Sequence, residues 1–130
     1  MSDIKALREK VKELKILFVD DERDVRHGTG LFLRKFFDNV VVCKDGQEGL
    51  SEFLKNKDFN VVITDILMPI MNGVEMVKEI RKINTDVFIV FLTASRGVSD
   101  IDKDLSNLTL QKPLSFEDMV LVMHKLEEIK

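Results

Sequence analysis

The short stretch FVDDER places three carboxylates, those of Asp20, Asp21 and Glu22, directly after a run of apolar residues. Carboxylates held this close repel one another, since two unit charges about 5 Å apart cost roughly 3 kcal/mol at an effective dielectric constant near 20. The triplet is therefore either the solvated start of a helix, whose dipole favours acids, or part of a site that holds a positive charge. Residues elsewhere in the chain decide between these interpretations.

Polar side chains stand at the ends of four apolar segments of the chain. In chain order these end groups are Asp20 with Asp21, then Asp65, Thr93 and Lys112. In an open sheet of parallel strands such groups meet at one edge, which is where ligands bind. If the first and third segments are neighbouring strands, three aspartates converge, and their repulsion penalises a small domain unless a cation lies among them. Oxygen ligands with room for water and phosphate are typical of a Mg²⁺ site.

An aspartate beside Mg²⁺, with a lysine and a hydroxyl nearby, is equipped for phosphoryl transfer. Asp65 is the candidate nucleophile because it stands alone at the end of its segment, whereas the adjacent Asp20 and Asp21 suit metal binding. The metal and Lys112 are expected to neutralise the phosphoryl oxygens, and Thr93 is expected to donate a hydrogen bond to one of them. The predicted chemistry is phosphorylation of a carboxylate.

The segments that position these groups alternate between strand-like and helix-like patterns. Five short apolar runs, typical of parallel strands covered on both faces, span residues 15–20, 39–44, 59–65, 86–93 and 108–113. Apolar residues recur at helical spacing in residues 24–37, 47–57, 73–83 and 116–130. A further helix within residues 95–107 is expected to be short or frayed, because that segment has few apolar residues. This order predicts an α/β fold, a (βα)₅ doubly wound parallel sheet with helices on both faces.

Residues 1–14 precede the first strand and carry an amphipathic helical pattern. Ile4, Leu7, Val11 and Leu14 recur at heptad spacing. Two heptads are marginal for an independent coiled coil, so we expect this extra N-terminal helix to pack on the body of the domain or on a partner. A homodimer formed through this helix is the alternative.

Composition narrows the class of protein. A length of 130 residues with 45% hydrophobic residues suits one globular domain, and a net charge of −3 offers no basic surface for nucleic acid. The apolar runs are too short to cross a membrane and the N-terminus is charged, so we expect neither membrane insertion nor a secretory signal, but a cytoplasmic protein. The lone Cys43 is expected to be a buried inert thiol, and His27 and His124 are expected at the surface.

Several short motifs, taken in order, resemble the receiver domain of two-component response regulators, the CheY-like family. The motifs are DD at 20–21, D at 65, MP at 68–69, NG at 72–73, TA at 93–94 and KP at 112–113. Each motif is weak by itself, but the ordered set is highly specific and the resemblance runs from about Lys15 to the C-terminus. It implies a flavodoxin-like sheet of strand order 2-1-3-4-5, with a receiver domain at residues 15–130 after an extension at residues 1–14.

The resemblance also implies roles and partners. Asp65 is the implied phosphoacceptor, Asp21 the direct Mg²⁺ ligand with Asp20 assisting, Thr93 the switch hydroxyl and Lys112 the phosphate partner. The implied donor is a phosphohistidine on a sensor histidine kinase or a histidine phosphotransfer protein, and phosphorylation changes binding to a downstream protein target. The Lys112–Pro113 peptide bond is expected to be cis, which proline permits at little cost.

Two residues depart from the family pattern. Leu67 stands where many receivers carry a polar side chain, although its backbone carbonyl remains a candidate metal ligand. Thr109 stands where the family usually has an aromatic or other large residue that turns inward on activation. From the resemblance as a whole we expect a single-domain signalling module rather than an enzyme, with two alternatives. One is a pseudo-receiver that is not phosphorylated, and the other is a Mg²⁺-dependent phosphohydrolase with an aspartyl-phosphate intermediate.

Overall fold

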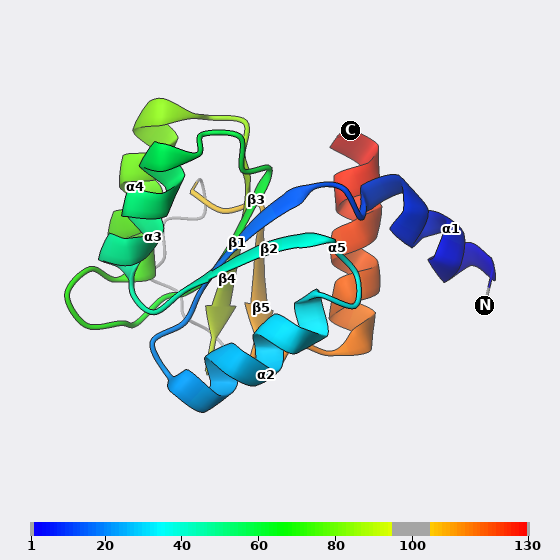
Figure 1. Cartoon of the computed structure of the whole chain (residues 1–130), viewed down its shortest axis with the longest axis horizontal. Coiled ribbons are helices and arrows are strands. Elements are labelled where there is room, and N and C mark those ends of the chain that lie inside the picture. Colours follow the sequence, from blue (N-terminus) through cyan, green and yellow to red (C-terminus); the bar gives the residue numbers. More distant parts are fainter. Residues whose placement is uncertain (1, 95–104, 130) are drawn as a thin grey trace.

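A five-stranded parallel sheet forms the centre of the computed structural model, which describes residues 2–94 and 105–129 (Figure 1). The strands are β1 (Lys15–Val19), β2 (Asn39–Cys43), β3 (Val61–Asp65), β4 (Phe88–Thr93) and β5 (Leu108–Gln111). Their order in the sheet is β2-β1-β3-β4-β5, and all neighbouring pairs are parallel. The predicted doubly wound fold and strand order are confirmed.

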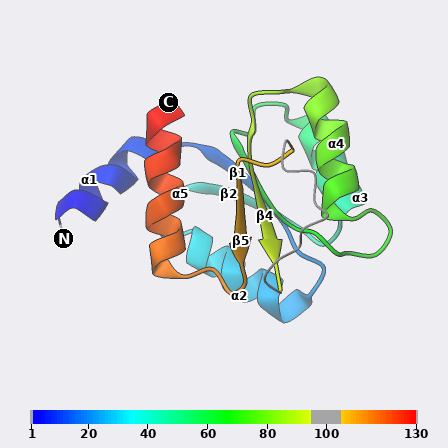
Figure 2. The same ribbon diagram turned by 180° about the vertical axis from the view of Figure 1, so that it is seen from behind.

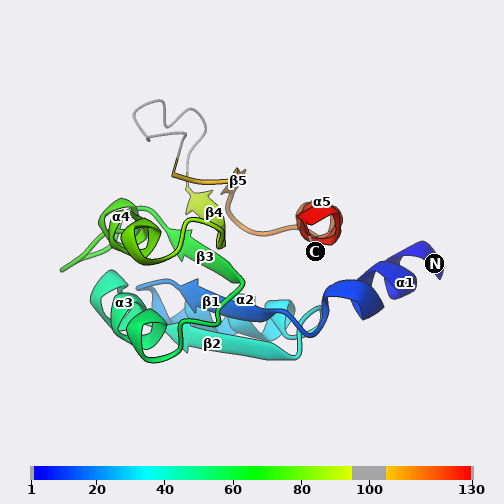
Figure 3. The same cartoon turned by 90° about the horizontal axis from the view of Figure 1, so that it is seen from above.

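Helices cover both faces of this sheet, as Figure 3 shows from above. They are α1 (Ser2–Val11), α2 (Arg23–Leu33), α3 (Gly46–Lys55), α4 (Gly73–Ile83) and α5 (Phe116–Ile129). The helices α2 and α5 lie on one face, and α3 and α4 lie on the other. The short helix expected within residues 95–107 falls mostly on residues 95–104, outside the described residues.

Two hydrophobic clusters, one on each face, account for this arrangement. Along β1, Ile16 and Phe18 join the cluster beneath α2 and α5, whereas Leu17 and Val19 join the cluster beneath α3 and α4. All four side chains are fully buried. Because both faces are covered, the strands need apolar residues at every position, which explains the absence of polar alternation in the sequence.

The helix α2 ends at Leu33 and not at the predicted Phe37. The chain tightens after Leu33, where Phe36 donates its backbone N–H to the Leu33 carbonyl at 3.0 Å, a 3₁₀-type bond. This turn places both Phe36 and Phe37 in the core. Burial of two aromatic side chains therefore overrides continuation of the helix.

The N-terminal helix α1 packs against α5 of the same chain, and Figures 1 and 2 both show it beside the C-terminal end of α5. Leu7 and Val11 are buried there, and Lys10 Nζ lies 2.9 Å from Glu127 Oε1. Arg8 Nε also donates to the Lys35 carbonyl at 2.8 Å. The apolar side of α1 is thus buried against α5 of the same chain.

Several smaller expectations are met. Cys43 is buried and forms no disulfide, and burial raises the pKa of its thiol to about 12, so it is protonated at neutral pH. His27 and His124 are exposed. The Lys112–Pro113 peptide bond is cis.

Candidate functional site

Strand register brings the predicted end groups to one edge of the sheet. Val19 of β1 pairs with Thr64 of β3, so the next residues, Asp20 and Asp65, leave adjacent strands side by side. Asp65 in turn pairs with Leu92 of β4, which places Thr93 one residue beyond.

The fifth strand delivers its lysine to the same edge. The Lys112 backbone N–H donates to the Thr93 carbonyl at 2.8 Å, which fixes the chain leaving β5 against the end of β4. Four parallel strands therefore present their polar end groups together, as the sequence predicts.

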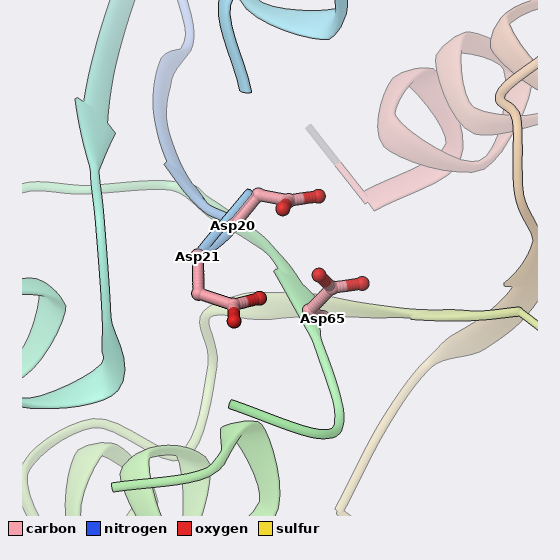
Figure 4. A group of neighbouring side chains, drawn as sticks. All are labelled: Asp20, Asp21 and Asp65. Atoms are coloured by element: carbon pink, nitrogen blue, oxygen red, sulfur yellow. The ribbon is translucent and has the colours of Figure 1, made fainter. Parts of the chain in front are cut away.

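Three carboxylates surround one small space at this edge (Figure 4). One carboxylate oxygen from each of Asp20, Asp21 and Asp65 lies within 4.8 Å of the others. Asp20 is fully buried and Asp65 is 6% exposed, whereas Asp21 is open to solvent. The cluster is thus sealed on the side of the sheet and accessible from outside through Asp21.

Lys112 bridges the two buried carboxylates. Its Nζ lies 2.6 Å from Asp65 Oδ1 and 3.0 Å from Asp20 Oδ2, and its side chain is 21% exposed. The contact with Asp20 is a charge contact without good hydrogen-bond alignment, because the buried Asp20 Oδ2 has no hydrogen-bond partner among the described residues. One ammonium among three carboxylates leaves an excess of two negative charges.

The pKa values of these groups reflect that crowding. Burial raises the pKa of Asp65 to about 6, and the neighbouring Asp20 adds to this rise while Lys112 opposes it. For Lys112, burial lowers the pKa, but the carboxylates of Asp65 and Asp20 outweigh burial and hold it above its ordinary value. At neutral pH the lysine is charged and Asp65 is mostly ionised.

Two neighbours position Asp20, and neither was predicted to do so from the sequence. The Glu22 backbone N–H donates to Asp20 Oδ1 at 2.9 Å, an Asx-type turn, while Arg26 Nη1 donates to the Asp20 carbonyl at 2.9 Å. Glu22 therefore serves through its backbone, and its side chain is exposed. The turn was detectable from an Asp three residues before the first residue of α2, whereas the hydrogen bond from Arg26 was not detectable from the sequence.

The NG motif at 72–73 shapes the loop that follows Asp65. Asn72 caps α4 by accepting from the Glu75 backbone N–H at 2.8 Å, and Glu75 Oε1 accepts from the Asn72 N–H at 3.1 Å. The Gly73 N–H donates to the Ile66 carbonyl at 2.8 Å. A side chain at Gly73 would overlap the backbone carbonyl of Asp65, so this position requires glycine.

The same loop exposes two large apolar side chains. Leu67 is 83% exposed and Ile70 is 75% exposed. Ile70 also has a φ of 72°, and the Met71 N–H donates to the Pro69 carbonyl at 2.8 Å, so Ile70 occupies the centre of a strained three-residue turn. The loop carries strain next to the acidic cluster.

A pocket of about 280 Å³ opens over the cluster. Its lining includes Asp21, Asp65, Leu67, Thr93 and Lys112. The remaining departure from the family pattern, Thr109, lies exposed on β5, where its hydroxyl is 3.4 Å from that of Ser106. Every predicted site residue therefore lies at this edge of the sheet, whereas Thr109 does not line the pocket.

The residues present suit a hard divalent cation. All three side-chain donors are carboxylate oxygens, their excess negative charge is two, and the buried Asp20 Oδ2 lacks a hydrogen-bond partner among the described residues. Oxygen ligands of this kind, partly open to solvent, are those that Mg²⁺ prefers.

None of the described helices is long and apolar enough to span a bilayer.

Comparison with known proteins identifies the family of this chain. The sequence profile described as "Response regulator receiver domain" matches residues 16–124. The two-component response regulator ORR42 of Oryza sativa subsp. japonica is 35% identical over 100 residues, which is 76% of each chain. The response regulator receiver protein CpdR of Brucella abortus is 30% identical over 115 residues, covering 86% of this chain and 95% of CpdR.

The solved structures agree with these relatives. The chemotaxis protein CheY4 of Vibrio cholerae matches with a TM-score of 0.77 at 28% identity, covering 87% of this chain and 98% of CheY4. Several other curated relatives are longer, and this chain spans only 32% to 50% of their length.

Proposed function

Because this chain belongs to the response regulator receiver domain family, we propose that it is a signalling module controlled by phosphorylation of Asp65. The observation that carries the proposal is the bridge made by Lys112, whose Nζ lies within 3.0 Å of carboxylate oxygens of both Asp20 and Asp65. The lysine thereby stands beside the oxygen that would carry the phosphoryl group. We place the receiver domain at residues 15–130, with residues 1–14 as its extension.

The proposed reaction transfers a phosphoryl group from a phosphohistidine nitrogen to a carboxylate oxygen of Asp65. An electron pair of the carboxylate forms the new P–O bond, and the P–N bond breaks with its electron pair remaining on the imidazole. Lys112 stabilises negative charge on the phosphoryl oxygens, and Thr93, which lines the same pocket, donates its hydroxyl to one of them. Asp65 suits the nucleophile because it is ionised at neutral pH yet little hydrated.

Mg²⁺ is the proposed cofactor. Asp21 and Asp65 would bind it directly, Asp20 would assist, and the backbone carbonyl of Leu67 is a further candidate ligand. Bound Mg²⁺ would supply the positive charge that the carboxylates and the incoming phosphoryl oxygens require.

The proposed partners follow from the family. The phosphoryl donor is a sensor histidine kinase or a histidine phosphotransfer protein, phosphorylation changes binding to a downstream protein, and the setting is the cytoplasm. Since α1 uses Leu7 and Val11 within its own chain, we propose a monomer, with a homodimer as the alternative. Mass measurement in solution, with and without residues 1–13, distinguishes the two.

Incubation with acetyl phosphate and Mg²⁺ tests the main proposal. Intact-mass spectrometry should detect one added phosphoryl group on the wild type and none on Asp65→Asn. Asp58→Asn, an exposed aspartate outside the pocket, is the matched control and should be labelled like the wild type. Rapid continuous turnover of acetyl phosphate supports the phosphohydrolase alternative, and absence of labelling supports the pseudo-receiver alternative.

A further inference from the structure

A second hollow lies beside α2 and β2, with a lining distinct from that of the acidic pocket. Its volume is about 550 Å³, within the range of small-molecule sites. Its lining residues are Arg23, Asp24, Arg26, His27, Gly28, Arg34 and Val42, and none of these lines the pocket around Asp65. The hollow is therefore a feature separate from the proposed phosphorylation site.

Three arginines meet at this hollow without carboxylate partners. Arg23, Arg26 and Arg34 form no ion pair with any described residue, and Asp24 is the only acid in the lining. Arg23 and Arg26 are three residues apart on a helix, where like charges are unfavourable. The arrangement is the opposite of the acidic cluster, since three guanidinium groups share the lining with the single carboxylate of Asp24.

Two of these arginines are held in place by the backbone. Arg26 Nη1 donates to the Asp20 carbonyl at 2.9 Å, and Arg34 Nη2 donates to the Val40 carbonyl at 3.3 Å. A guanidinium has five N–H donors, so each retains donors for a ligand. Arginines fixed in this way lose less side-chain freedom when they bind an anion than mobile ones do.

Gly28 lines the hollow without contributing a side chain. Glycine is unfavourable inside a helix, yet a Cβ at Gly28 meets no atom within 4 Å, so packing does not require glycine there. Gly30 differs, because its Cβ would come within 3.4 Å of the Val42 side chain. A larger side chain at position 28 would therefore extend into the open space beside the arginines without a clash.

We propose that this hollow binds a small anion carrying two or more phosphate groups, such as the diphosphate of a nucleotide. Planar guanidinium groups bind phosphate oxygens in pairs, and a volume of about 550 Å³ exceeds what one phosphate fills. Arg26 joins this site to the acidic cluster, because the same side chain holds the Asp20 backbone.

Titration with inorganic pyrophosphate and with ADP, in Mg²⁺-free buffer, tests the proposal by amide chemical shifts of the full chain. The expected shifts centre on residues 23–34 and Val42. Binding of either probe there supports the proposal, and the tighter of the two shows whether a nucleoside contributes. Shifts confined to the surroundings of Lys112, or absence of binding by both probes, overturn the proposal.

Variants locate the site independently. The double variant Arg23→Gln with Arg34→Gln should weaken pyrophosphate binding about tenfold or more, equivalent to about 1.4 kcal/mol. The matched control, Lys57→Gln with Lys78→Gln, removes the same charge from exposed positions elsewhere and should change binding less than about twofold. Equal weakening by both pairs means that net charge alone attracts pyrophosphate, and overturns the proposal.

Gly28→Leu places an apolar side chain in the hollow without changing its charge. It should weaken pyrophosphate binding severalfold while the melting temperature stays at or above that of the wild type, because leucine favours helix more than glycine does. Unchanged binding in folded Gly28→Leu overturns the proposal, and the arginine variants remain decisive if that variant does not fold.

Discussion

Lys112 Nζ lies 2.6 Å from Asp65 Oδ1, although 47 residues separate them along the chain (112 − 65). Lys112→Met removes the ammonium and leaves two buried carboxylates facing each other without compensation. We expect the free energy of unfolding, measured by urea denaturation without Mg²⁺, to fall by about 1–3 kcal/mol. Phosphorylation by acetyl phosphate should fall sharply as well. Lys78→Met, on an exposed position of α4, is the control and should have little effect on either quantity.

Mg²⁺ should stabilise the folded chain, because the acidic cluster carries an excess of two negative charges. A ligand that binds only the native state at a hundred times its Kd adds about 2.7 kcal/mol of stability. The melting temperature should therefore rise with Mg²⁺ in the wild type and stay nearly constant in Asp21→Asn. A wild-type melting temperature that does not change with Mg²⁺ concentration would contradict this explanation of the three aspartates.

Stability should also depend on pH through Asp65. Its pKa in the folded state, about 6, exceeds the ordinary value of 3.8, so the native state binds this proton more tightly than the unfolded state does. The contribution of Asp65 to the free energy of unfolding is thus unfavourable above its folded pKa and is relieved as pH falls through about 6 toward 4.

Asp65→Asn provides the comparison for this pH effect. In metal-free buffer the variant should be more stable than the wild type at pH 7, and the difference should shrink at pH 5. Urea denaturation at both pH values measures it. A difference that is the same at both values would show that Asp65 titrates normally.

Gly73→Ala should disturb the site through the backbone. Its new methyl group overlaps the Asp65 carbonyl, so the loop after β3 has to move, at a cost of about 1–3 kcal/mol in stability and with slower phosphorylation. Gly28→Ala is a matched control, because its methyl group meets nothing within 4 Å and should stabilise α2 by about 0.5–1 kcal/mol. Similar effects of the two changes on phosphorylation would sink the steric explanation.

Leu67 should lengthen the lifetime of the phosphorylated state. Its apolar side chain lines the pocket beside Asp65, where a polar side chain would orient the attacking water. Leu67→Asn should therefore hydrolyse its phosphoryl group faster, which loss of the added mass over time measures. Leu54→Asn, at an apolar and exposed position of α3 outside the pocket lining, is the control and should keep the wild-type rate.

Local patterns in the sequence identified the fold and most of the candidate site. Apolar runs that lack alternation marked five strands, and the residues that end them, among them Asp65 and Lys112, had to meet at one edge of a parallel sheet. The boundaries of α4 were predicted correctly at both ends from the helical spacing of its apolar residues, and the structure shows that Asn72 caps its start.

Other features depended on contacts between distant residues, which no local pattern encodes. The end of α2 was wrong because Phe37 is drawn into the core, and the role of Gly73 is visible only where its backbone meets the Asp65 carbonyl. The hydrogen bond from the Arg26 guanidinium to the Asp20 backbone carbonyl likewise requires the turn between these residues.

The sequence by itself determined which polar groups end the strands and so share one edge of the sheet, because residue type and strand position are local properties. The tertiary structure decided which aspartates are buried, which two of them Lys112 bridges, and that Arg23, Arg26 and Arg34 meet around an open hollow. Burial and distance set the strength of every charge interaction, and both exist only once the strands have paired and the helices have packed.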